Sequence, residues 1–432
     1  MTNAFPTPER DAADGGVVAV RRDLHQHPEL GFTEIRTAAR VVTELSGLGW
    51  RTVYGRDAGD VRGLAGLPDQ STLDAAVERA RGCGVPDELV TALRDGHTAV
   101  LADLDGDRPG PSVALRFDMD ALPILESADP GHVPAARGFR SSYDGIMHAC
   151  GHDGHVAIGV ALARRLADGR FPGRVRLLFQ PAEEGVRGAR AMVAAGAVDD
   201  VDVFYATHLG LGLPVAAVAA TTTGRFATSK FSARFTGRAA HASGSPEAGR
   251  NALISAATAA LNVQGLPRFA AADTRVNVGR LVAGTAANII AAHAEMAFEV
   301  RSTDAEVVAE MARRSTLICE SAAAMHDVLC EVVETGRAGA APSDPGLVAA
   351  VVVAARTIPG VSEVHEAWPA LGSDDATLFM DRVHTTGGTA TYLGVGGGDI
   401  APHHSDVFDV DERALPVAVA LLEKLVRDGR HG

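Results

Sequence analysis

Apolar runs that end in chemically active side chains are the feature that most constrains this fold. The runs are SVALRF before Asp118 and Asp120, RVRLLFQ before Glu183 and Glu184, and VDVFYAT before His208. Short apolar runs bounded by polar residues are typical of buried strands. A further segment, MHACGHDGH, is followed by VAIGVALARRL, whose apolar residues have helical spacing. This alternation predicts an α/β fold, with a mostly parallel sheet, helices on both faces, and ligands beyond the carboxyl ends of the strands.

The segment 223–335 has a different order of elements. Strands over SKFSARF, RVNVGRLVAG, AEMAFEVRS and DVLCEVVE combine with a helix over GRNALISAATAALNVQG and a second, longer helix. Thr303, with Glu306 three residues later, predicts the cap of the longer helix. The resulting order β-α-β-β-α-β is ferredoxin-like. We therefore expect 223–335 to form an inserted α+β lid or dimerisation domain, and 1–222 with 336–432 to form a discontinuous catalytic domain.

Composition excludes several classes of partner. Hydrophobic residues make up 46% and charged residues 22% of the chain, as in ordinary soluble proteins. A formal charge of -14 argues against nucleic acid or an anionic membrane surface as partner. The start, MTNAFPTPERDAADGG, lacks the apolar core of a signal peptide, and no apolar run approaches the roughly 18 residues of a membrane span. Four cysteines in 432 residues do not suggest a disulfide framework, so we expect a cytoplasmic protein.

The segment from His148 to His155 is the densest cluster of chemically active side chains. Its members are His148, Cys150, His152, Asp153 and His155. Thiolate, imidazole and carboxylate groups bind borderline divalent metals. The glycine between Cys150 and His152 lets the backbone bend closely, so both side chains could face one ion. A catalytic thiol or a set of helix-capping residues is the alternative, and this motif alone leaves both open.

The pair Glu183-Glu184 and three more histidines add possible ligands. Neighbouring side chains diverge in an extended chain, so one glutamate could bind metal while the other faces a water molecule. A solvated acidic turn is the alternative for the pair, and a lone histidine such as His208, His403 or His404 is more often structural. Together these positions favour a metal centre. The chain contains neither a GxSxG motif nor a Walker A loop.

At these residues the chain resembles the M20 metallopeptidases, specifically their aminoacylase-like amidohydrolase branch. The matching motifs are RRDLHQHPELGFTE, RFDMDALP, MHACGHDGH, LLFQPAEEG, FTGRAAHAS, GRNAL, NVG, GSDDAT and HHSDVFDVDE. They occur in this order from about Arg21 to Glu412. The resemblance implies a metal-dependent amidohydrolase that cleaves the amide bond of an N-acyl amino acid.

The resemblance also implies a ligand set for two divalent ions, Mn²⁺ or Zn²⁺. Cys150 would bridge the two ions, and the remaining ligands would be His152, Glu184, His208 and His404. Of the two tandem histidines, His404 matches the ligand position better than His403. Glu183 would be the general base, and Asp120 matches a supporting aspartate. Asp118 stands where other branches carry a metal-binding histidine.

Three positions in the inserted segment match family residues that contact substrate. His241 matches a histidine that reaches the catalytic site of the partner and stabilises the developing oxyanion. Asn288 and Arg301 match positions that can contact the substrate carboxylate. A loop cap is the alternative for Asn288, and a surface ion pair is the alternative for Arg301.

The resemblance points to an aryl-acyl glutamate such as p-aminobenzoyl-glutamate as substrate. An N-acyl amino acid deacylase of other specificity is the alternative. The expected assembly is a homodimer or a heterodimer with a related chain, and a protein that is active only together with a similar partner chain stays open. A catalytically silent member of such a pair would have no need of Cys150, Glu183 and His404 together.

Overall fold

The computed structural model describes residues 16–398 and 400–429, and the chain divides into two compact units. The first unit contains the residues up to Thr223, Ala341–Ala370 and the residues from Asp375 on. The second unit contains Gly224–Ala340 and Leu371–Asp374. Most of the predicted insertion, 223–335, lies in the second unit, and its role as a lid or dimerisation domain stays a prediction. The N-terminal segment MTNAFPTPERDAADGG, on which the expected lack of a signal peptide depends, lies mostly outside the described residues.

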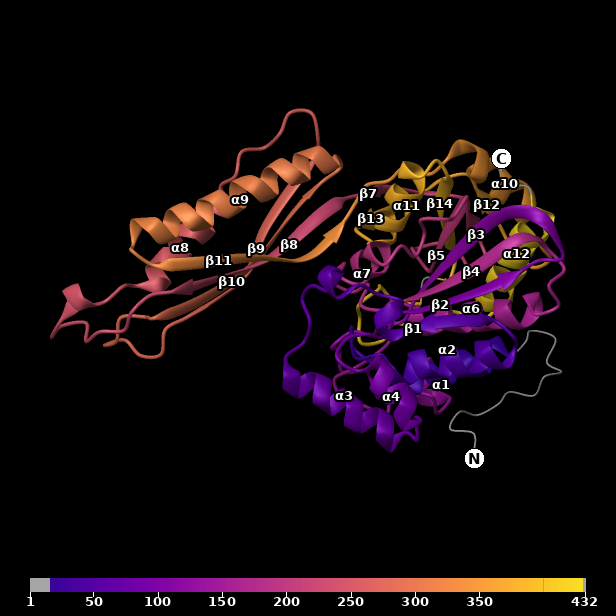
Figure 1. Ribbon diagram of the computed structural model, residues 1–432, viewed down its shortest axis with the longest axis horizontal. Helices are drawn as coiled ribbons and strands as arrows, with labels where there is room; N and C mark the ends of the chain where they lie inside the picture. Colours follow the sequence, from indigo (N-terminus) through magenta and orange to yellow (C-terminus); the bar gives the residue numbers. More distant parts are fainter. Residues whose placement is uncertain (1–15, 399, 430–432) are drawn as a thin grey trace. The chain divides into compact units, whose positions relative to one another are not determined.

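An eight-stranded sheet forms the centre of the first unit, in the order β1-β2-β4-β3-β5-β14-β6-β12 (Figure 1). Its strands are β1 (Arg51–Tyr54), β2 (Val100–Asp105), β3 (Arg108–Asp118), β4 (Pro172–Gln180), β5 (Val203–Leu209), β6 (Val218–Ala219), β12 (Val364–His365) and β14 (Thr389–Val395). The central strands β4, β3, β5 and β14 are parallel, and antiparallel strands flank them. The prediction of a mostly parallel sheet is therefore confirmed. Strands β7 (Thr222–Arg225) and β13 (Trp368–Gly372) form a separate pair.

Helices cover both faces of this sheet because successive strand residues point to opposite sides. Leu115 and Phe117 pack in one core with α1 (Val17–Gln26), α2 (Ile35–Gly47), α6 (His152–Leu166), α10 (Pro345–Ala355) and α12 (Ala414–Asp428). Their neighbour Ala114 packs in a second core with α7 (Ala189–Ala194) and α11 (Ala376–Thr385). A short helix, α5 (Val133–Ala136), lies between β3 and α6 in the sequence. The predicted two-sided arrangement is confirmed.

The second unit has the predicted ferredoxin-like order. Its elements are β8 (Ala227–Thr236), η3 (Pro246–Ala248), α8 (Ala252–Gln264), β9 (Thr274–Ala283), β10 (His293–Ser302), α9 (Ala305–Met325) and β11 (Leu329–Ala338). The strands form an antiparallel sheet in the order β11-β8-β10-β9, and both helices cover one face of it (Figure 1). Alternate residues of β10, including Met296 and Phe298, are buried against the helices.

One local prediction was wrong. Asp304, not Thr303, caps α9, because its Oδ1 accepts hydrogen bonds from the backbone N–H groups of Glu306 (2.8 Å) and Val307 (3.2 Å). The segment from Thr52 to Gly96 begins in β1, which pairs with β2. The rest of that segment forms η1 (Gly55–Asp57), η2 (Val61–Gly63), α3 (Gln70–Gly82) and α4 (Asp87–Leu93).

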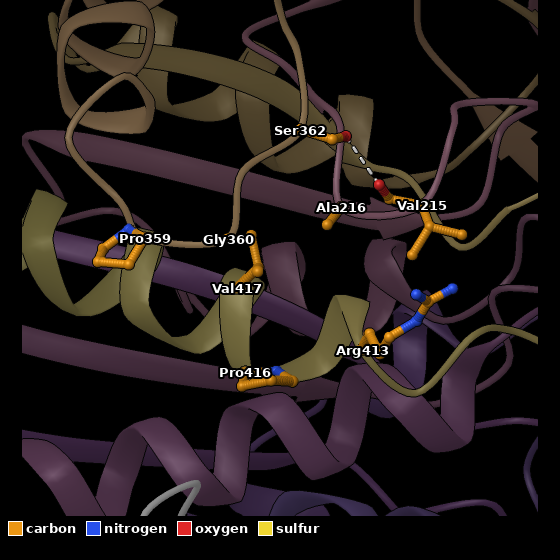
Figure 2. Close-up of a pocket in the computed structure, with 8 residues that line it drawn as sticks. All are labelled: Val215, Ala216, Pro359, Gly360, Ser362, Arg413, Pro416 and Val417. Atoms are coloured by element: carbon orange, nitrogen blue, oxygen red, sulfur yellow. Dashed lines mark hydrogen bonds between the residues drawn. The ribbon is translucent and has the colours of Figure 1, made fainter.

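A pocket of about 460 Å³ opens on the first unit between the start of α12 and two loops (Figure 2). Its lining is mainly apolar, and Ser362 Oγ donates to the carbonyl oxygen of Val215 (2.8 Å) beside it. The predicted site residues do not line this pocket. All four cysteines are free, in line with the expected lack of a disulfide framework. Within 16–398 and 400–429, no helix combines the length and apolar character needed to cross a membrane.

Candidate metal centre

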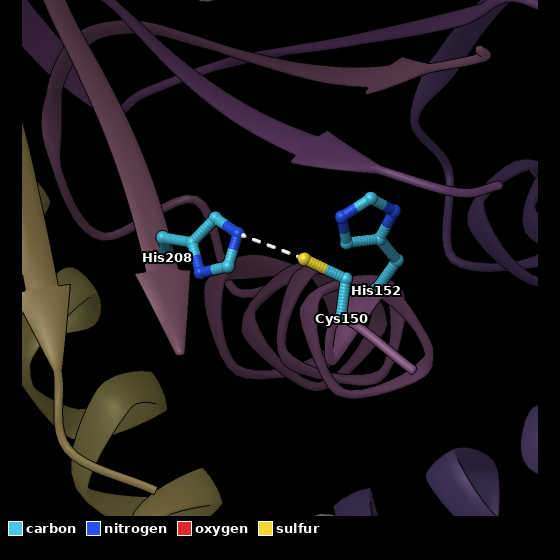
Figure 3. Close-up of side chains that lie close together, drawn as sticks. All are labelled: Cys150, His152 and His208. Carbon is cyan, nitrogen blue, oxygen red and sulfur yellow. Dashed lines mark hydrogen bonds between the residues drawn. The ribbon is translucent and has the colours of Figure 1, made fainter. Parts of the chain in front are cut away.

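A left-handed glycine places the first two possible ligands side by side. Gly151 has φ of 90°, a conformation that residues with a side chain rarely adopt, and it precedes the first residue of α6, His152. Cys150 on one side of the glycine and His152 on the other therefore point toward the same space. His208 reaches this space from β5, and its ring faces the Cys150 sulfur (Figure 3).

Cys150 belongs to two groups of possible ligands. Within Cys150, His152 and His208, the ligand atoms all lie within 4.8 Å of one another, and Cys150 Sγ is 3.6 Å from His208 Nε2. The same holds for Cys150, Glu184 and His404, in which His404 Nε2 is 3.2 Å from Glu184 Oε1. The structure thus brings all five predicted ligands together. Cys150 is the residue that the two groups share.

The hydrogen bonds of two histidines leave one nitrogen of each ring available to a metal. His152 Nδ1 bonds the backbone oxygen of Asp120 (2.8 Å), and His208 Nδ1 bonds that of Leu209 (2.7 Å). Since a carbonyl can only accept, each Nδ1 carries a proton, and in the neutral form of each ring Nε2 keeps its lone pair. His152 Nε2 is buried and has no hydrogen-bond partner in the described part of the chain. Imidazoles held in this way are typical metal ligands, so the residues present fit a metal ion.

His155 was named in the sequence cluster without a role, and in the structure it supports the ligands. Asp118, His152 and His155 also form a close group. However, His155 Nδ1 bonds Asp118, and its Nε2 accepts from the backbone N–H of Leu209 (2.9 Å). Both ring nitrogens are therefore occupied. The available signal was its position three residues after His152, which puts both rings on one helix face.

The tandem histidines have different hydrogen-bond partners. His403 Nε2 accepts from the backbone N–H of Leu211 (3.2 Å), so a neutral ring carries its proton on Nδ1, which lies 3.4 Å from Cys150 Sγ. His403 can therefore donate to the sulfur. His404, at a left-handed φ of 65°, turns its Nε2 toward Glu184 instead. The choice of His404 as ligand stays a prediction that this geometry supports.

Asp120 holds the loop that carries the two glutamates. Its Oδ1 accepts from the backbone N–H of Glu183 and its Oδ2 from that of Glu184, both at 2.9 Å. The loop contains left-handed residues at Ala182 (φ 49°) and Val186 (φ 58°). Each costs about 1–2 kcal/mol, so the loop needs partners outside itself. Glu183 is buried, and its Oε2 lies 3.9 Å from His152 Nε2.

Burial controls the protonation of the thiol and of one imidazole. Burial, followed by the charge of Glu184, raises the pKa of the Cys150 thiol well above its usual range. A catalytic cysteine and a metal-bound cysteine both act as the thiolate, so this shift alone does not distinguish the two alternatives. Burial also lowers the pKa of His208 well below its usual value and keeps the ring neutral, the form that binds metals.

A buried ionic network supports the start of α6. Arg21 is 1% exposed, and its Nε donates to Asp153 Oδ2 (2.9 Å) while its Nη2 donates to Asp409 Oδ1 (2.5 Å). His25 Nδ1 bonds the same Asp153 oxygen (2.8 Å). Asp153 directly follows the possible ligand His152, so this network fixes the backbone next to the metal centre.

The remaining predicted residues lie in the second unit. His241 Nδ1 accepts from the backbone N–H groups of Ser243 (3.2 Å) and Gly244 (3.1 Å), so its exposed ring carries the proton on Nε2. Asn288 is exposed, and Arg301 forms a two-pronged ion pair with Glu299 (2.8 and 2.9 Å). That pair is the alternative considered for Arg301. The roles of all three residues stay predictions.

Comparison with known proteins gives the family. Residues 114–428 match the model of peptidase family M20/M25/M40. The chain belongs to this family. This M20 chain is therefore a metal-dependent amidohydrolase, and the resemblance inferred from its motifs is confirmed.

Relatives of known name match almost the whole M20 chain. It is 45% identical over 407 residues to indole-3-acetyl-aspartic acid hydrolase of Enterobacter agglomerans, covering 93% of both chains. It is 42% identical to one of the subunits of p-aminobenzoyl-glutamate hydrolase from Escherichia coli, over 94% of this chain and 93% of the relative. Among solved structures, the aminobenzoyl-glutamate utilization protein from Klebsiella pneumoniae matches with a TM-score of 0.83 and 39% identity, over 96% of this chain and 95% of that one.

Proposed function

We propose that the chain hydrolyses the amide bond between an aryl-bearing acyl group and an acidic amino acid, with p-aminobenzoyl-glutamate as the expected substrate. One relative is named for that compound and another for indole-3-acetyl-aspartic acid. The two named compounds share an aromatic acyl group and an amino acid with two carboxylates. The observation that carries the proposal is the pair of ligand groups sharing Cys150, with Glu183 held beside them.

Two divalent ions would complete this site. His152 and His208 would hold one ion, Glu184 and His404 would hold the other, and Cys150 would contact both. One thiolate and three imidazoles suit Zn²⁺ better than Mg²⁺ or Ca²⁺, and Mn²⁺ is the other ion that the family resemblance implies. When bound, such ions supply Lewis acidity, which makes water more acidic and a carbonyl carbon more electrophilic.

The chain's own residues would then move the protons. Glu183 takes a proton from the attacking water on its carboxylate and delivers it to the leaving nitrogen, while Asp120 holds the loop that aims it. His241 has its proton on Nε2 and is therefore able to donate a hydrogen bond to the developing oxyanion. The family resemblance implies that it would do so in the site of the partner chain. Asn288 and Arg301 would bind the substrate carboxylate, which requires Arg301 to exchange its partner Glu299.

The test is a substrate panel on purified protein. We would strip the metal with a chelator, reload with Mn²⁺ or Zn²⁺, and measure hydrolysis of p-aminobenzoyl-glutamate, indole-3-acetyl-aspartate and several N-acetyl amino acids. Glu183→Gln is the test variant, and Glu366→Gln, an exposed carboxylate, is the control. We expect metal-dependent turnover of the aryl-acyl substrates that Glu183→Gln loses and Glu366→Gln keeps. Preferred hydrolysis of the N-acetyl amino acids would favour the deacylase alternative.

Association with another chain is suggested by the Escherichia coli relative, which is named as one part of a hydrolase with subunits. In the second unit, apolar side chains of α8 (Leu253, Ile254, Leu261) and of the edge strand β9 (Leu281, Val282) are exposed. Exposed apolar edges of this kind are typical of association surfaces. We infer that this unit pairs either with a second copy or with a related chain. Light scattering separates the cases: a monomer that is inactive with two metals bound indicates a missing partner, and a fully active monomer excludes the dimer.

A further inference from the structure

The motif RRDLHQHPELGFTE contains a turn that packs on the loop carrying Glu183 and Glu184. A Cβ atom added at Gly31 would lie 3.0 Å from Ala182 Cα, so only glycine allows this approach without movement of the backbone. The guanidinium of Arg187 lies over the ring of Phe32, 5.2 Å from its centroid. The same guanidinium donates to the backbone oxygen of Glu184 (3.2 Å). The turn and the loop are therefore in direct contact.

Carboxylates accept hydrogen bonds from three consecutive backbone amides of the loop. Glu34, at the end of the turn, accepts the first of these bonds, and Asp120 accepts the other two. The Oε1 of Glu34 accepts from the backbone N–H of Ala182 (2.8 Å), just before the two amides that Asp120 holds. Its Oε2 accepts from Thr98 Oγ1 (2.7 Å), and the side chain is fully buried. Ala182 is left-handed, and a left-handed alanine persists only where its surroundings impose that conformation.

We propose that Glu34 is a positioning residue for hydrolysis, which holds the amide of Ala182 and thereby fixes the direction in which the Glu183 carboxylate leaves the loop. The kinetic consequence rests on the proposed function. A displacement of about 1 Å at a reacting group can cost on the order of a hundredfold in rate. The hydrogen bond to Ala182 is thus a determinant of kcat.

Glu29 is a matched control within the same motif. It is a buried glutamate whose two oxygens accept from the backbone N–H groups of Arg36 (2.9 Å) and Thr37 (2.8 Å). These amides belong to the first turn of α2, so the Glu29 side chain caps a helix and does not hold the loop. Removal of the Glu29 side chain should therefore lower the stability of the protein and leave the loop that carries Glu183 in position.

The kinetic test compares Glu34→Met, Glu34→Gln and Glu29→Met. Methionine preserves volume and removes both acceptors, whereas glutamine keeps one oxygen for Ala182. We expect Glu34→Met to lower kcat by about 30- to 300-fold with KM within about threefold. The kcat of Glu34→Gln should stay within about fivefold of the wild-type value. The kcat of Glu29→Met, calculated per folded molecule, should stay within about threefold of wild type although its Tm is lower. If Glu34→Met fails to fold, Thr98→Val should lower kcat by about three- to tenfold.

Equal kcat in Glu34→Met and Glu29→Met, or equal losses in Glu34→Gln and Glu34→Met, would overturn the proposal. Hydrogen exchange tests the same contact without any substrate, by mass spectrometry of peptides covering residues 181–188. The amides of Ala182, Glu183 and Glu184 should exchange faster in Glu34→Met, or in Thr98→Val, but not in Glu29→Met. Unchanged exchange rejects the positioning role. A wild-type protein inactive on every substrate rejects the proposed function and leaves the exchange result as the test of Glu34.

Discussion

His25 links the stability of this protein to pH. Its Nδ1 bonds Asp153 Oδ2 (2.8 Å) and its Nε2 bonds Glu126 Oε1 (3.0 Å), so both nitrogens carry protons. Burial alone would favour the neutral ring, but the two carboxylates outweigh burial and the nearby Arg21, and they raise the pKa of His25 to about 9. The unfolded value is about 6.5. Because the folded pKa is the higher one, protonated His25 stabilises the fold fully below pH 6.5, and this contribution is lost as pH rises through 9.

The size of the effect follows from the shift. A rise from 6.5 to about 9 corresponds to about 3 kcal/mol at about 1.4 kcal/mol per pKa unit. We would measure the free energy of urea unfolding of metal-stripped wild type and His25→Gln between pH 6 and pH 9.5. The free energy of unfolding of wild type minus that of His25→Gln should be about 3 kcal/mol larger at pH 6 than at pH 9.5. An equal difference at both ends of the range would refute the reasoning.

Three further outcomes test the metal centre. Glu183→Gln should lower kcat by about a hundred- to ten-thousandfold with bound metal unchanged by mass spectrometry, and loss of metal would point to a ligand role instead. Cys150→Ser should reduce the content of both ions, because Cys150 belongs to both ligand groups; loss of only one ion argues against a bridge. Gly210→Ala should destabilise the fold by about 1–3 kcal/mol in urea, because its φ is 86° and the new Cβ would lie 2.6 Å from His403 Nε2. An unchanged unfolding midpoint would contradict that reasoning.

The sheet, and the gathering of polar side chains at its edge, could be predicted because they depend on local patterns, whereas the ligand set was implied by the family resemblance. Parallel strands bring their carboxyl ends to one edge, so residues following the runs before Asp118, Glu183 and His208 had to meet. The predicted cap of α9 was wrong by one residue. Thr303 and Asp304 are both residue types that cap helices well, and the direction of the backbone decides between them.

Long-range contacts were beyond the sequence patterns. Glu34 and Ala182 are 148 residues apart, and their hydrogen bond depends on how a turn packs against a loop. The hydrogen bonds of His403 could not be inferred either. His403 and His404 are neighbours of the same residue type, and only the left-handed backbone at His404 gives their rings different partners. His155 carried a helical signal, but its occupied nitrogens became visible only with Asp118 and Leu209 in place.

The buried guanidinium of Arg21 has a consequence for biosynthesis. Its partner Asp409 lies 388 residues further along the chain, so the ribosome must add all of these residues before this ion pair can close. Until then, Arg21 has Asp153 as a partner but lacks Asp409, and an incompletely paired buried charge is costly. The start of α6 therefore reaches its final form late in synthesis. Nascent chains of this enzyme should depend on chaperones for longer than their early, locally folding helices would suggest.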